Sequence, residues 1–173
     1  MVGLSGCISL GKTCAFLGND YDKILGMRCG HHTPPGLKAR IMEQAVDLIE
    51  NEDVDTFLVG EKGGFEVDAY DVVLELQKEY SHIRIIFVIS NITDLHEMGG
   101  DSSYVAQRRG FDDFIYPPKC ELGYKRLSIV YRNRYIIENT DFIIAYNKRK
   151  GKAYEFCKAA KGKSVKVIEL AVK

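Results

Sequence analysis

Residues 60–68, GEKGGFEVD, contain three glycines and three carboxylates within nine positions. Glycines at this spacing let the backbone turn tightly and approach a ligand closely. Before a helix, they leave free N–H groups and the positive end of the helix dipole facing an anion such as phosphate. Carboxylates beside such a site can bind ribose hydroxyls or activate water. The candidate ligand-binding residues of this segment are Gly60, Glu61, Gly63, Gly64, Glu66 and Asp68.

The same residues have an ordinary structural interpretation. Glu66 and Asp68 are favourable charges in the first turn of a helix, and the glycines can serve only to make a turn. We favour the ligand site because the segment follows a predicted strand, where parallel sheets bind their ligands. Glu66 and Asp68 are therefore also the candidate catalytic residues.

A second phosphate-binding pattern lies in residues 6–13, GCISLGKT, which satisfies G-x-x-x-x-G-K-[ST]. In a P-loop the chain leaves a strand, wraps backbone N–H groups around phosphates and enters a helix. Here only Met1 to Ser5 precede the pattern, and the segment that follows, TCAFLG, has the composition of a strand. This order is the reverse of what the chemistry requires, so NTP binding at residues 6–13 is a minor alternative.

The segment YKRLSIVYRNRYIIEN, residues 124–139, predicts a helix with polar groups on a buried face. Asn133 shares helical spacing with Val130 and Ile137, and a buried amide needs hydrogen-bond partners. It can cap a loop or contact a ligand. Arg132 is a candidate for pairing with phosphate.

The cysteines and histidines do not complete a metal site. The five cysteines contain no C-x-x-C pair and are typical of reduced thiols in a cytoplasmic protein. The segment CGHH, residues 29–32, supplies half a ligand set, and no second cluster completes it. We expect no metal, no cofactor and a cytoplasmic location.

The amino-acid composition argues against two classes of binding partner, nucleic acids and membranes. The 173 residues carry 24 basic and 24 acidic side chains, a formal net charge of zero, which argues against nucleic acid as a partner. No apolar run approaches the roughly 18 residues of a membrane span. We therefore expect a small-molecule ligand and no membrane partner.

Apolar periodicity predicts strands that alternate with helices. Strands are expected at residues 13–18, 56–60, 84–89, 112–116, 142–146 and 164–170. Helices are expected at residues 37–50, 65–80, 124–139 and 152–161, with a loop and a short helix at 90–110. This alternation implies right-handed crossovers and a mostly parallel sheet with helices on both faces, an α/β fold of the Rossmann-like three-layer type.

Such sheets bind ligands outside the carboxyl ends of their strands. Besides residues 60–68, the loops after the first, fourth and fifth strands are therefore candidate binding segments. They contribute the candidates Gly18, Asn19, Tyr116, Lys150 and Gly151.

Several segments together resemble one family. TCAFLGND, FLVGEKGGFEVDAYDVVLELQKEYSHI, IYPPKCE, RNRYIIENTDFIIAY and AKGKSVKVIEL are similar to the YpsA/YoqJ-like proteins of the SLOG superfamily. That superfamily also includes cytokinin-activating phosphoribohydrolases, the DprA core and molybdenum-cofactor carriers. The resemblance, over roughly residues 12–171, implies a single Rossmann-like domain at 12–173 after a leader or disordered segment at 1–11. It also implies a nucleotide-type ligand and, by analogy, a homodimer.

The chain departs from the family's pattern at two loops. After the first strand, family members usually carry Gly-His-Arg, where this chain has Gly18, Asn19 and Asp20. After the fifth strand they carry a glycine-rich loop, where residues 148–152 supply one glycine and four cations. The P-G-G-x-G-T-x-x-E motif of the phosphoribohydrolases is absent.

Two functions remain as alternatives. In the first, the chain binds a nucleotide or nucleotide-derived ligand as a sensor or carrier, with phosphate on Gly63, Gly64 and residues 148–152. The ribose would then contact Glu66 or Asp68. The missing histidine and the altered loop favour this binding role.

In the second, the chain is an enzyme that cleaves the N-glycosidic bond of a nucleotide. Glu66 or Asp68 would stabilise an oxocarbenium-like centre or activate water, and Arg132 would hold the phosphate.

Overall fold

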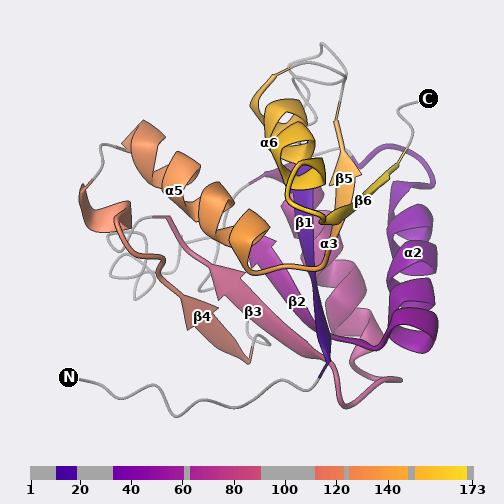
Figure 1. Cartoon of the computed structure of the whole chain (residues 1–173). Coiled ribbons are helices and arrows are strands. Elements are labelled where there is room, and N and C mark those ends of the chain that lie inside the picture. The colour runs from indigo at the N-terminus through magenta and orange to yellow at the C-terminus, as the bar shows by residue number, and fades with distance from the viewer. Residues whose placement is uncertain are drawn as a thin grey trace.

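The computed structural model describes residues 11–18, 33–60, 63–90, 112–122, 125–147 and 151–170. Within these ranges six strands form one sheet (Figure 1). They are β1 (Lys12–Gly18), β2 (Val54–Gly60), β3 (Arg84–Val88), β4 (Asp113–Ile115), β5 (Phe142–Tyr146) and β6 (Lys166–Glu169). Their order is β4-β3-β2-β1-β5-β6, and every pairing is parallel.

Four helices of the described residues cover the sheet. They are α2 (Leu37–Glu52), α3 (Gly64–Leu76), α5 (Lys125–Glu138) and α6 (Lys152–Lys161), and a short 3-10 helix, η2 (Cys120–Leu122), precedes α5. Helices α2 and α3 pack on one face, whereas α5 and α6 pack on the other (Figure 1). The predicted α/β three-layer architecture is confirmed, with a sheet that is parallel throughout the described strands.

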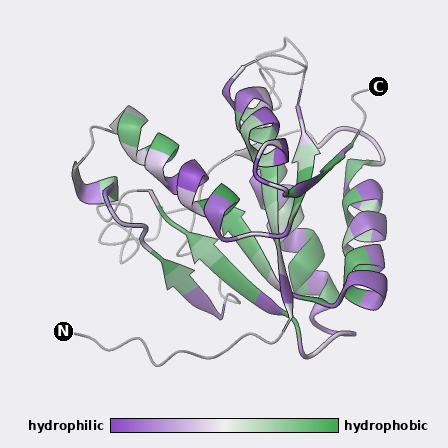
Figure 2. Ribbon diagram, viewed as in Figure 1, coloured by the Kyte–Doolittle hydropathy of each residue, from purple (hydrophilic) through white to green (hydrophobic). Residues whose placement is uncertain are grey.

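The two faces of the sheet are both apolar because helices cover both. In β1, Cys14 and Phe16 point into the layer beneath α2 and α3, and Ala15 and Leu17 into the layer beneath α5 and α6. Alternate residues of a strand point to opposite faces, so burial on both sides requires a continuous apolar run. Figure 2 shows this as apolar colour along the central strands, with polar colour mainly on the outer sides of the helices.

Several predicted boundaries differ from the structure, and the backbone explains two of the differences. The helix predicted at 65–80 ends at Leu76, because the N–H groups of Lys78 and Glu79 bond three residues back, in tight turns. The strand predicted at 164–170 begins only at Lys166, because Ser164 has a φ of 65°, outside the β region. Residues 91–111, most of the predicted loop with a short helix, lie outside the described residues.

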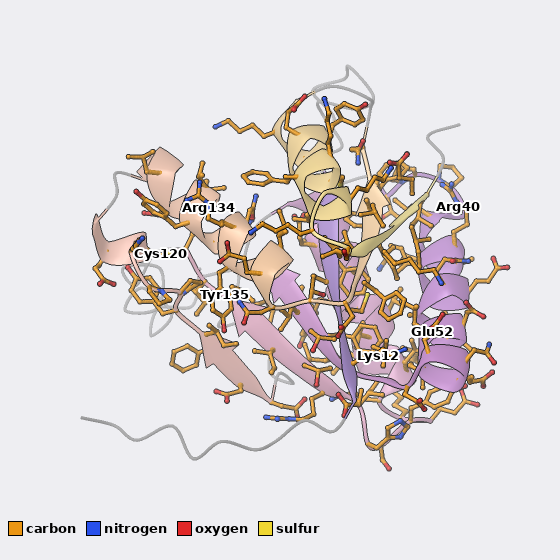
Figure 3. All side chains as sticks on the ribbon, in the orientation of Figure 1. Lys12, Arg40, Glu52, Cys120, Arg134 and Tyr135 are labelled. Atoms are coloured by element: carbon orange, nitrogen blue, oxygen red, sulfur yellow. The ribbon has the colours of Figure 1, made fainter. Side chains whose placement is uncertain are left out.

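The lysine of the P-loop-like pattern, Lys12, is the first residue of β1. Its Nζ lies 3.1 Å from Glu52 Oε2, and Lys166 Nζ lies 3.1 Å from Glu52 Oε1. Both ammonium groups lie 5.5 Å from the centroid of the Phe142 ring. Figure 3 shows Lys12 near the amino end of β1. A strand therefore begins where a P-loop needs a helix, at the edge opposite the carboxyl ends.

Among the described helices, none combines the length and apolar composition that crossing a bilayer requires.

Among the described residues three cysteines are buried: Cys14, Cys120 and Cys157. Burial raises the pKa of Cys157 to about 11, assisted by the charge of Glu169, and burial raises the pKa of Cys14 above its usual range. A protonated, inaccessible thiol reacts slowly, because the thiolate is the nucleophile.

We therefore expect at most two of the five thiols of the native chain to react quickly with Ellman's reagent near pH 8, roughly the pKa of a free thiol. All five should react after unfolding in guanidinium. A fast native reaction of three or more thiols would contradict the burial of this core.

Candidate functional site

The order of the strands reverses between β1 and β5. Strands β2, β3 and β4 follow on one side of β1, and β5 and β6 lie on the other. The last residue of β1, Gly18, is in register with the last residue of β5, Tyr146. The next described helices in the chain, α2 after β1 and α6 after β5, pack on opposite faces, so the carboxyl ends of β1 and β5 form the switch point at which parallel sheets bind ligands.

Three helices begin at this edge directly after a glycine with positive φ: Gly36 (72°), Gly63 (120°) and Gly151 (91°). Such angles favour glycine, and a glycine N-cap has no side chain to accept the first-turn N–H groups. A Cβ at Gly36 or Gly151 would meet no atom within 4 Å. The amino ends of α2, α3 and α6 thus present positive dipole ends to the same edge.

Gly18 is needed for packing inside the domain. A Cβ at this position would lie 2.4–2.6 Å from ring and Cβ atoms of Phe65. The Phe65 ring stacks on Tyr146 with centroids 5.9 Å apart and meets Phe16 edge-on at 6.4 Å. The glycine predicted to approach a ligand therefore makes room for an aromatic side chain of α3.

Gly60 makes room for two charged side chains. A Cβ there would lie 3.2 Å from Arg132 Nη1 and 3.3 Å from Glu66 Cγ. Arg132 and Glu66 are only 6% and 5% exposed. Since α3 and α5 cover opposite faces of the sheet, these side chains bring the two helical layers together over the carboxyl end of β2.

Asn133 is a hydrogen-bond partner of the buried Arg132. Its Oδ1 accepts hydrogen bonds from Arg132 Nε at 3.0 Å and from Arg132 Nη2 at 2.8 Å. Asn133 is itself 6% exposed, as its helical spacing predicted. Two predicted site residues, Arg132 and Asn133, therefore contact each other directly.

Asp68 faces a different neighbour from Glu66. Its Oδ1 accepts a hydrogen bond from Thr33 Oγ1 at 2.9 Å and lies 3.3 Å from Lys38 Nζ. Burial would lower the pKa of Lys38, but the hydrogen bonds and charges of Asp71 and Asp68 outweigh it and raise that pKa. Asp68 therefore ties the start of α2 to α3.

The remaining predicted residues are placed as follows. Gly64 is buried as the first residue of α3, and Gly151 precedes α6 at the switch point. Tyr116 follows the edge strand β4, and two strands separate it from β1. Asn19, Glu61 and Lys150 lie outside the described residues.

Arg40 is a cation at this edge that sequence reasoning missed. Its Cζ lies 5.9 Å from the centroid of the Tyr146 ring, at the end of β5 (Figure 3). Burial raises the pKa of Tyr146, and the charge and hydrogen bond of Arg40 oppose that shift. Its position in the sequence could have indicated this place, because Arg40 comes three residues after the buried Leu37 and one before the buried Ile41 in α2.

The described residues hold no group of three or more His, Cys, Asp or Glu side chains suited to a metal ion. The CGHH segment, residues 29–32, lies outside them. No family model matches the chain, and no curated protein matches it either. The resemblance to YpsA/YoqJ-like proteins therefore stays a prediction.

The packing around Gly18 makes a testable prediction. Gly18→Ala should lower the free energy of unfolding by about 1–3 kcal/mol, because its methyl group would overlap the Phe65 ring. Urea unfolding measures the loss.

Gly162→Ala is the matched control. Gly162 has a φ of −70°, and its Cβ would lie 3.4 Å from the nearest heavy atom, Ala159 O. This variant should match the wild type or gain up to about 1 kcal/mol. Equal stabilities for the two variants would show that Phe65 does not fill the space over Gly18.

Proposed function

We propose that the chain binds a nucleotide or nucleotide-derived ligand at the carboxyl edge of its sheet, as a sensor or carrier module. One observation carries the proposal: a buried arginine, Arg132, lies at the end of β2, next to the switch-point strand β1. In the same proposal the chain is cytoplasmic, as its thiols indicate, and forms a SLOG-type homodimer, as its sequence resemblance implies.

The chemistry of the edge favours phosphate as the group that is recognised. The Arg132 guanidinium lies at this edge, and arginine binds phosphate through charge-assisted hydrogen bonds. The planar guanidinium matches the oxygens of phosphate, and the amino ends of α3 and α6 add N–H groups and positive dipole ends. Glu66, which flanks the same Gly60, is suited to a ribose hydroxyl.

The zero net charge of the chain favours a small ligand over a nucleic acid. A groove for a polyanion would require an excess of Lys and Arg over Asp and Glu, whereas the two classes are equal in number here.

The binding proposal is tested with Arg132→Met, which removes the charge and keeps much of the bulk. Isothermal titration with nucleoside 5′-monophosphates, NAD and ADP-ribose should find at least one ligand for the wild type. Arg132→Met should weaken that ligand roughly 10- to 100-fold, the loss of a charge-assisted hydrogen bond.

Arg134→Met is the matched control, because Arg134 is an exposed residue of the same helix (Figure 3). It should bind the ligand like the wild type. Circular dichroism and the unfolding midpoint of each ligand-free variant check that the fold is intact. Equal affinities for Arg132→Met and Arg134→Met would contradict the proposal.

The hydrolase alternative is favoured by one further observation, the burial of Glu66 against the strand end and Arg132. A carboxylate in this position is suited to stabilising an oxocarbenium-like centre or activating water. Asp68 is less suited, because it faces Thr33 and Lys38.

Chromatography of nucleoside 5′-monophosphates incubated with the protein separates the two functions. The hydrolase releases free base, and Glu66→Gln should abolish the release. Glu75→Gln, an exposed change on the same helix, should keep it. If no base appears from a nucleotide that binds, the protein is a binding module for that nucleotide.

A further inference from the structure

One contact at the site joins two residues that are neighbours in sequence, Arg132 and Asn133. Consecutive helical residues point about 100° apart, so their side chains seldom form hydrogen bonds with each other. Nevertheless both Nε and Nη2 of Arg132 donate to the single Oδ1 of Asn133, at 3.0 and 2.8 Å, and both residues are buried. The Nε edge of the guanidinium is therefore held by the next residue along α5.

Two hydrogen bonds to one oxygen fix the plane of the guanidinium as well as its position. The Nη1 end is then the part nearest to Gly60, at 3.2 Å from the site of a Cβ. Glu66 Cγ borders the same position at 3.3 Å. The arginine is thus oriented toward the end of β2 before any ligand arrives.

The chemical identity of the partner matters. Asn133 offers an acceptor oxygen without a negative charge, so it orients the guanidinium and adds no negative charge of its own to the site. A carboxylate at the same position would accept the same hydrogen bonds and neutralise the cation. An orienting amide is the better choice for a cation that has to attract an anion.

We propose that Asn133 is the positioning residue for Arg132, and that the pair makes the site select ligands with a terminal phosphate over the same ligands without it. This inference rests on the proposed nucleotide-binding function and deepens it. Orientation in advance favours binding because a long side chain no longer has to be ordered when the ligand arrives.

The experiment measures phosphate preference, defined as the dissociation constant of a nucleoside divided by that of its 5′-monophosphate. Isothermal titration supplies both constants for the adenine, guanine, cytosine and uracil pairs on the full chain. Asn133→Ala should reduce the preference roughly tenfold while the affinity for the nucleoside stays unchanged. A purely structural role for Asn133 would weaken both ligands together and leave the ratio constant.

Asn133→Asp is the second variant. Aspartate has nearly the same shape as asparagine and keeps the acceptor oxygen, so this variant should fold even if Asn133→Ala does not. It should also lose phosphate preference, since the added negative charge repels the phosphate. Asn139→Ala is the matched control: Asn139 is exposed after the same helix and bonds to Tyr135 O. It should keep the wild-type ratio.

The outcomes separate the two proposals. If the wild type prefers monophosphates and both Asn133 variants keep that preference, the positioning role is overturned and the binding function stands. If the wild type binds neither member of any pair, the proposed function is overturned and the positioning role with it.

Discussion

The burial of β1 on both faces and its pairing on both edges is the constraint on which the rest of the structure depends. The side chains from Cys14 to Leu17 are at most 3% exposed, although they point alternately to opposite faces. Such a strand needs a helical layer on each side, and a parallel sheet supplies these layers through its right-handed crossovers. Since the chain extends the sheet first on one side of β1 and then on the other, the strand order must reverse beside β1.

Burial explains the apolar layers, but it does not explain the polar cluster above them. Arg132, Asn133 and Glu66 are all nearly inaccessible at the end of β2. A buried ionic or polar group is weak evidence for stability, because apolar residues of similar volume often stabilise a fold as well or better. A cluster of this kind, at the edge where parallel sheets bind ligands, is the observation on which the proposed binding function rests.

The fold was predictable from the sequence because each central strand is buried on both sides. Segments such as TFLVG and RIIFVI therefore appear as uninterrupted apolar runs, and the helices between them keep a regular apolar spacing. The position of β1 between β2 and β5 was not predictable, since it depends on contacts between residues far apart in the chain. The roles of Gly18 and Gly60 also depend on such contacts, with Phe65 for one and Arg132 for the other.

For the candidate site, the helical geometry of residues 64–76 was enough to predict that Glu66 and Asp68 have different neighbours. Glu66 and Asp68 are two positions apart, roughly 200° around the helix, so they cannot face the same ligand atom. The structure divides them accordingly: Glu66 lies against Gly60 at the strand ends, and Asp68 holds Thr33 and Lys38 beside α2. One carboxylate of the pair thus lies at the strand ends, and the other contacts the start of α2.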